Sequence, residues 1–186
     1  MTATKEKTWT VEQYHRMIEA GILTEGDKIE LLDGRIVEMS PQTPVHAATT
    51  QRSCDYIKQL LAGQAHVRMQ LPITLATSEP EPDIAVVCID PGAYRDHHPN
   101  PSEILLLIEV SYATLQIDRR EKAPIYSRAN IPEYWVLDVA AREAYIYRNP
   151  ASGDYQSEIV VADNAVMRML AFPEIEISFS NLFLPV

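Results

Sequence analysis

The chain has 186 residues, of which 46% are hydrophobic, and this is enough for one ordinary core and too little for two. We therefore expect a single domain over residues 1–186. The formal net charge of −10 argues against a protein that binds nucleic acid through an overall basic surface. Cys54 and Cys88 show no metal-ligand spacing and are too few for a disulfide framework, which favours a reducing compartment.

No segment of the sequence is typical of membrane insertion or secretion. The first ten residues are charged and contain no apolar signal region, and the longest aliphatic run, residues 104–108, is far too short to span a bilayer. We expect a cytoplasmic protein that makes no membrane contact.

The first part of the chain predicts a helix followed by a hairpin. Residues 1–8 form a polar end that we expect to be disordered. Thr10 is a candidate N-cap for a helix that ends at Gly21. Asp33-Gly34 lies between two alternating segments within residues 28–39, a strong hairpin signal. Glu30 falls on the first arm, where the simplest interpretation is a solvent-facing strand residue.

Residues 45–61 carry an apolar stripe at helical spacing, and Gly63 is a candidate cap for the end of that helix. His46, near its start, is more typical of a surface residue than of a ligand. Residues 67–75 predict a strand in which Pro72 indicates an edge position or an irregularity. A second, apolar strand opens at Asp83, and residues 90–102 predict a surface loop.

The second half predicts a buried strand, a helix and several further strands. The strand at residues 104–111 is apolar on both faces and carries Glu109, which favours a central position. A helix over residues 115–129 contains Pro124, which predicts a kink or a late start, and Asn130 is its candidate left-handed cap. The expected later elements are strands at 133–138, 144–148, 155–161 and 166–170, turns at Asn149-Pro150 and Ser152-Gly153, and a docked apolar tail at 175–186. This order predicts an α/β fold with a mixed sheet flanked by helices.

Two carboxylates stand in apolar strands where strand patterning would not place them. Asp83 opens one strand and Glu109 lies near the end of the other, and a buried carboxylate needs a positive partner to stay ionised. If the strands are neighbours, the two groups converge and can bind a magnesium ion, which takes one or two carboxylates and keeps several waters.

Lys122 is a second candidate partner for these acids. Asp118, Lys122 and Tyr126 recur at i, i+4 and i+8 and so share one helical stripe. On the sheet side, the Lys122 ammonium would stabilise the negative charge of a phosphoryl transition state. The alternative, which spacing alone favours, is a solvated lysine paired with Asp118.

Several segments together resemble a known family in their order and spacing. They are residues 30–34 (ELLDG), 82–87 (PDIAVV), 108–111 (IEVS), the Asp118, Lys122 and Tyr126 stripe, and 131–138 (IPEYWVLD). From about residue 8 to the C-terminus the chain resembles the Uma-two family of endonuclease-like proteins, a branch of the PD-(D/E)xK, restriction-endonuclease-like superfamily.

The resemblance implies an αβββαβ core, here with an N-terminal helix-hairpin and extra C-terminal strands. It also implies that Asp83 and Glu109 bind Mg²⁺ or Mn²⁺ and that Glu30 is an additional acid near the site. The superfamily's lysine follows two residues after the second acid, where this chain has Ser111. The resemblance implies that members of this family share this departure and carry the lysine on the following helix, at the position of Lys122.

The helix that carries Lys122 is locally basic, because Arg119, Arg120 and Arg128 outweigh its acids. This face is a candidate phosphate contact, for which we name Arg119 and Arg120 together with Ser111 and Tyr126. A mixed, solvated helix is the equally simple alternative.

The sequence thus predicts a Mg²⁺- or Mn²⁺-dependent endonuclease acting on DNA as a homodimer, with Asp83, Glu109, Lys122 and Glu30 in the site. A non-catalytic binding or dimerisation module is the alternative that the net charge and Ser111 favour. A hydrolase of RNA or small nucleotides is a third interpretation, which suits an acidic surface.

Overall fold

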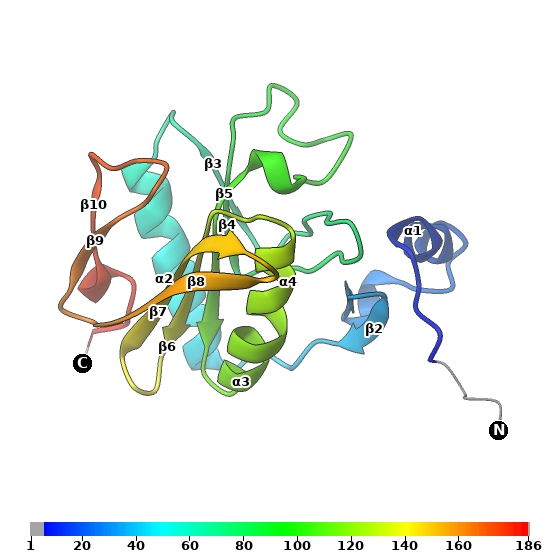
Figure 1. Cartoon of the computed structure of the whole chain (residues 1–186), viewed down its shortest axis with the longest axis horizontal. Coiled ribbons are helices and arrows are strands. Elements are labelled where there is room, and N and C mark those ends of the chain that lie inside the picture. The colour runs from blue at the N-terminus through cyan, green and yellow to red at the C-terminus, as the bar shows by residue number, and fades with distance from the viewer. Residues whose placement is uncertain (1–5, 186) are drawn as a thin grey trace.

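The computed structural model describes residues 6–185 and contains a six-stranded mixed sheet (Figure 1). Its strands are β3 (His66–Met69), β4 (Ile84–Val87), β5 (Ile104–Ser111), β6 (Glu133–Asp138), β7 (Glu143–Ala151) and β8 (Asp154–Ala162). They lie in the order in which they occur in the chain, and all neighbours are antiparallel except β5 and β6, which are parallel. The predicted class, a mixed sheet flanked by helices, is confirmed.

Helices cover both faces of this sheet. Helix α2 (Pro44–Leu60) packs on one face together with the C-terminal segment, where Phe179 and Phe183 are fully buried. Helices α3 (Leu115–Ile117) and α4 (Ala123–Arg128) cover the other face. β5 lies between β4 and β6, so the predicted central position of the Glu109 strand is confirmed.

The N-terminal helix and hairpin lie at one end of the molecule (Figure 1). They are α1 (Val11–Glu19), β1 (Ile29–Leu32) and β2 (Arg35–Glu38). Thr10 caps α1 in a reciprocal capping box with Gln13, as predicted. Asp33 and Gly34 both have positive φ (47° and 74°), the conformation that a two-residue hairpin turn requires.

The helix predicted over residues 115–129 is interrupted by a π-helical turn. α3 and α4 are joined by a turn over residues 118–122, and the Ala123 N–H donates to the Asp118 carbonyl. Pro124 has no N–H to continue the α-helical ladder and its ring crowds the carbonyl of Arg120, which gives a physical reason for the wider turn. Asn130 has φ 58° and ends the helix in the left-handed region, as predicted.

Two details of the predicted strands are wrong. Asn149-Pro150 is not a turn: β7 continues to Ala151, and only Ser152-Gly153 forms the connection to β8. Asn149 has φ 57°, so it bends the strand without ending it. The strand predicted over 67–75 is limited to β3. Beyond it, the backbone N–H groups of Ile73 and Thr74 donate to carbonyls of loop residues instead of a neighbouring strand. The remaining pair is β9 (Val166–Arg168) with β10 (Glu176–Ser178).

Short 3-10 turns lie at Glu25–Asp27, Pro101–Glu103 and Phe179–Asn181. Ile177, Phe179, Leu182 and Phe183 are buried in the core, so the predicted docking of the tail is confirmed for its described residues. The disorder predicted for residues 1–8 falls largely on residues 1–5, which lie outside the described range. Among residues 6–185, no helix has both the length and the apolar character to cross a membrane.

Candidate active site

Asp83 and Glu109 lie opposite each other where strands β4 and β5 pair. The antiparallel register pairs Ile84, the first residue of β4, with Ile108, so Asp83, directly before β4, faces Glu109 of β5. The Asp83 N–H donates to Glu109 Oε2 at 3.3 Å, and the two residues are 8% and 3% exposed. The predicted convergence of the two carboxylates is present, on the sheet face that α4 covers.

Lys122 reaches this pair from the π-helical turn. Its Nζ lies 3.0 Å from Glu109 Oε1 and 3.5 Å from Glu30 Oε1. The residue is 8% exposed, so the alternative of a solvated helix lysine is wrong. Asp118 shares the stripe but bonds through Oδ2 to the Thr114 hydroxyl at 2.7 Å. The ammonium therefore bridges acids from two different elements.

Glu30 comes from the hairpin and is buried, which contradicts its simplest interpretation as a solvent-facing residue. It is 6% exposed, and its Oε2 accepts the Glu81 N–H at 3.2 Å. Two ion pairs hold the hairpin against the helical segment, Arg35 with Glu121 and Arg128 with Asp33. These pairs stabilise the contact between β1 and Lys122.

Tyr126, one helical turn beyond Lys122, is fully buried and donates to Glu109 Oε1 at 3.0 Å. Glu109 Oε1 thus accepts two bonds, from the Lys122 ammonium and the Tyr126 hydroxyl. Burial raises the pKa of Tyr126 well above its usual value, and the carboxylates of Glu109 and Glu30 add to this, so the hydroxyl keeps its proton and acts as a donor.

Asp83 is held by groups that the sequence did not mark as site residues. Its Oδ2 accepts from His46 Nε2 at 3.1 Å and from the Val110 N–H at 2.8 Å, and its Oδ1 accepts from Gln70 Nε2 at 3.1 Å. Burial alone would raise the pKa of Asp83, but these donors, His46 above all, hold the pKa below its usual value. The expectation that His46 is a surface residue is wrong.

The site contains more carboxylates than cations. Burial raises the pKa of Glu109 well above its usual value; the Lys122 ammonium opposes this, and the charges of Asp83, Asp118 and Glu30 add to it. Burial alone would lower the pKa of Lys122, but three surrounding carboxylates raise it above its usual value. The raised pKa of Glu109 indicates that Lys122 compensates its charge only in part, so a further positive charge beside Glu109 would be favourable.

The hydrogen bonds leave one open position on each of the two central acids. A carboxylate has about four lone-pair sites. Asp83 uses two on Oδ2 and one on Oδ1, and Glu109 uses two on Oε1 and one on Oε2. Asp83 Oδ1 and Glu109 Oε2 therefore each keep one lone pair without a hydrogen bond within the described residues. Two such carboxylates fit the one or two that Mg²⁺ takes from a protein.

Protein side chains alone do not complete a metal cage. In the part of the chain that the structure describes, no group of three or more His, Cys, Asp or Glu side chains is arranged to hold an ion. The remaining coordination positions would fall to water and substrate oxygens, as is usual for magnesium in phosphoryl chemistry.

Comparison with known proteins places this geometry in a family. Residues 11–180 match the model of the Uma2 family, which is described as "Putative restriction endonuclease". The chain belongs to the Uma2 family. Its structure is similar to the crystal structure of "a putative nuclease belonging to DUF820" from Anabaena variabilis ATCC 29413, with a TM-score of 0.74 and 16% identity over 94% of this chain and 97% of that chain. A search of curated proteins finds no match.

The structural match supports the restriction-endonuclease-like fold that the resemblance implied for this Uma2 chain. Ser111, in the superfamily's lysine slot, is 1% exposed and lies 3.4 Å from the Thr114 hydroxyl. The ammonium beside Glu109 comes instead from Lys122, which is the arrangement that the family resemblance implied.

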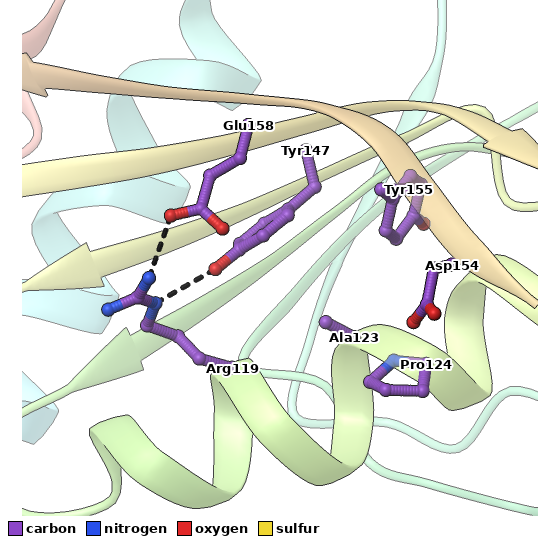
Figure 2. Close-up of a pocket in the computed structure, with 7 residues that line it drawn as sticks. All are labelled: Arg119, Ala123, Pro124, Tyr147, Asp154, Tyr155 and Glu158. Carbon is purple, nitrogen blue, oxygen red and sulfur yellow. Dashed lines mark hydrogen bonds and ion pairs between the residues drawn. The ribbon is translucent and has the colours of Figure 1, made fainter.

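The basic residues of the π-helical turn and α4 do not form one surface. Figure 2 shows Arg119 directed into a small pocket, where it bonds to the Tyr147 hydroxyl at 2.9 Å and to Glu158 at 2.7 Å. Arg128 pairs with Asp33 on the hairpin. Arg120 is exposed and makes no ion pair within residues 6–185. Of the two arginines named for phosphate contact, it is therefore the one whose charge is not already paired, since Arg119 pairs with Glu158.

Proposed function

We propose that this Uma2 protein is a Mg²⁺- or Mn²⁺-dependent endonuclease that hydrolyses phosphodiester bonds of DNA. One observation carries the proposal: Asp83 and Glu109 converge, each with one lone pair not used in a hydrogen bond, beside the buried ammonium of Lys122. This is the donor set that metal-assisted phosphoryl transfer requires, with acids for the ion and a fixed positive charge for the transition state.

In this mechanism Asp83 and Glu109 are the residues that would hold the ion. When bound, the ion supplies a Lewis acid and lowers the pKa of a coordinated water. Lys122 donates to the phosphoryl oxygens and stabilises the charge that develops on them. Glu30 and Tyr126 are positioning residues in this proposal, because Glu30 fixes the ammonium and Tyr126 fixes the Glu109 carboxylate.

DNA is the proposed substrate, and a cytoplasmic homodimer that supplies one site to each strand is the proposed active form. Arg120, exposed and unpaired within the described residues, is the proposed phosphate contact outside the centre. The formal charge of −10 favours a second candidate, hydrolysis of RNA or of small nucleotides, which require less basic surface than a long duplex.

A non-catalytic module is the remaining alternative, and burial of the acids argues against it. A module without chemistry has no need for two buried carboxylates whose oxygens are left incompletely bonded, since such groups destabilise the fold. The convergence of Lys122 on the same point strengthens this argument, because the lysine comes from a separate element.

The test is nicking of supercoiled plasmid by the purified protein with Mg²⁺, Mn²⁺ or a chelator. We expect metal-dependent nicking that Asp83→Asn abolishes and Lys122→Met reduces by about 100-fold or more. Lys58→Met, which removes an exposed lysine from α2, is the matched control and should cleave like wild type. No cleavage of plasmid, RNA or nucleotide diesters with either metal would refute the proposal, and cleavage of RNA or nucleotides alone would move it to the second candidate.

A further inference from the structure

His46 stands at a fixed position at the start of α2. It is the third residue of the helix, after Pro44 and Val45, and its N–H donates to the Thr43 hydroxyl that caps the helix, at 3.2 Å. A proline at the first position and a side-chain cap both order this turn. The imidazole therefore leaves a rigid backbone and reaches Asp83 with a side chain that is 16% exposed.

The contact uses one particular oxygen of Asp83. His46 Nε2 lies 3.1 Å from Oδ2, the same oxygen that accepts the Val110 N–H at 2.8 Å. Because the carboxylate only accepts, Nε2 must carry a proton. With both donors present, the two lone pairs of Oδ2 are occupied. Oδ1 accepts only from Gln70, at 3.1 Å, and keeps a lone pair open.

We propose that His46 is a positioning residue that keeps Oδ2 of Asp83 out of the metal's coordination, so that Asp83 offers Oδ1 alone. This inference rests on the proposed function, because it assigns how the proposed ligand meets its ion. His46 is not itself the ligand: Nε2 is used by Asp83, and Nδ1 is buried without a hydrogen-bond partner within the described residues.

An Asp83 carboxylate with one available oxygen binds an ion in monodentate fashion, which affects which ion the site prefers. Mg²⁺ demands near-octahedral coordination and binds carboxylates sparingly, whereas Ca²⁺ accepts bidentate carboxylates and a larger number of oxygens. By filling Oδ2, His46 favours the smaller ion and its manganese substitute. Its removal opens a second oxygen on Asp83, loosens the carboxylate and makes bidentate binding of Ca²⁺ available.

The test measures ion binding to the intact, metal-free protein rather than catalysis. Free Mn²⁺ is followed by electron paramagnetic resonance during titration, and Ca²⁺ affinity is obtained by competition. His46→Leu removes the donor, while His46→Gln restores an amide N–H. His97→Leu is the matched control, because His97 also contacts a carboxylate, Glu103 at 3.3 Å, but away from Asp83. Circular dichroism melts with chelator confirm that each variant is folded.

We expect His46→Leu to weaken Mn²⁺ binding by about 10- to 100-fold, as loss of a group that orients a ligand does elsewhere, while Ca²⁺ affinity is unchanged or increases. His46→Gln should recover most of the Mn²⁺ affinity, and His97→Leu should match wild type. Equal weakening of both ions, or unchanged Mn²⁺ binding in His46→Leu, would overturn the inference and leave the proposed function standing. Absence of Mn²⁺ binding by wild type would overturn both.

Discussion

Replacing Lys122 by methionine tests how much the ammonium stabilises the buried carboxylates, because the effect can be measured as a change in the free energy of unfolding without any activity assay. The substitution keeps most of the side-chain volume but removes the cation 3.0 Å from Glu109 Oε1. Glu109, 3% exposed, then has no cation in contact within residues 6–185 and must take up a proton to remain buried. Protonating a carboxyl with an ordinary pKa of about 4.3 costs about 3.7 kcal/mol at pH 7 and about 1 kcal/mol at pH 5.

These values set an upper limit for the loss that comes through Glu109, because burial already raises its pKa in the wild-type chain. We expect Lys122→Met to lower the free energy of unfolding by about 3 kcal/mol at pH 7, in the range found when a buried ion pair loses one partner. The sign follows from the protonation: the proton becomes easier to bind as pH falls toward the unfolded pKa, so the deficit shrinks toward pH 5.

The assay is urea unfolding followed by circular dichroism at pH 5 and pH 7, with a chelator present. A loss of about 3 kcal/mol corresponds to a melting temperature lower by about 6–12 °C for a chain of this size. The double variant Lys122→Met/Glu109→Gln should recover most of the loss, because the glutamine needs no counter-charge. A single variant as stable as wild type at pH 7, or a deficit that grows on acidification, would refute the reasoning.

Three further predictions concern packing, hydrogen bonding and thiol exposure elsewhere in the molecule and at Tyr126. Gly34→Ala should lower the free energy of unfolding in urea by about 2 kcal/mol or more, because a Cβ at this positive φ would lie 2.8 Å from the Thr8 Cβ. Gly63→Ala, also at positive φ but with nothing within 4 Å, should lose only about 1 kcal/mol, and equal losses would contradict this. Tyr126→Phe should lower stability by about 2 kcal/mol through loss of its bond to a carboxylate, and an unchanged melting curve would argue against that bond. Burial raises the pKa of the Cys54 thiol, so a thiol reagent should modify only the exposed Cys88 until the protein unfolds.

Local chemistry made much of this fold predictable from sequence. Thr10 and Asn130 mark helix ends because their side chains or backbone conformations satisfy requirements of the helix terminus. Asp33-Gly34 marks a turn because both residues adopt positive φ readily. The strand of Glu109 is apolar on both faces because helices cover both sides of the sheet.

The errors arise where a residue's local preference has two structural solutions. At Pro124 the predicted late start is confirmed, because α4 begins at Ala123 with the proline in its first turn; what the sequence did not predict is the π-helical turn before it. Asn149-Pro150 suits a turn, yet β7 absorbs the positive φ of Asn149 as a bend and continues. In both cases tertiary packing decides which backbone conformation forms, and the local sequence pattern carries no information about that packing.

The residues themselves marked Asp83 and Glu109, whose type is unexpected in an apolar strand, while Lys122 and Glu30 were expected in the site through the family resemblance. A carboxylate in an apolar strand, as at Asp83 and Glu109, is conspicuous because its burial requires compensation. His46 and Gln70 are polar residues in ordinary polar surroundings, and only the three-dimensional contact reveals them, 37 and 13 residues from Asp83 in the chain. Thr43-Pro44, an N-cap followed by a proline at the first helical position, is a sequence signal from which the ordered backbone at His46 could have been expected.

The most direct test of the proposed metal centre is a crystal of the protein soaked with Mn²⁺ and measured for anomalous scattering. The proposal predicts one anomalous peak per chain within coordination distance of Asp83 Oδ1 and Glu109 Oε2, absent in Asp83→Asn crystals. A peak bound elsewhere, or no peak at saturating Mn²⁺, would contradict the assignment of these two acids as the metal centre.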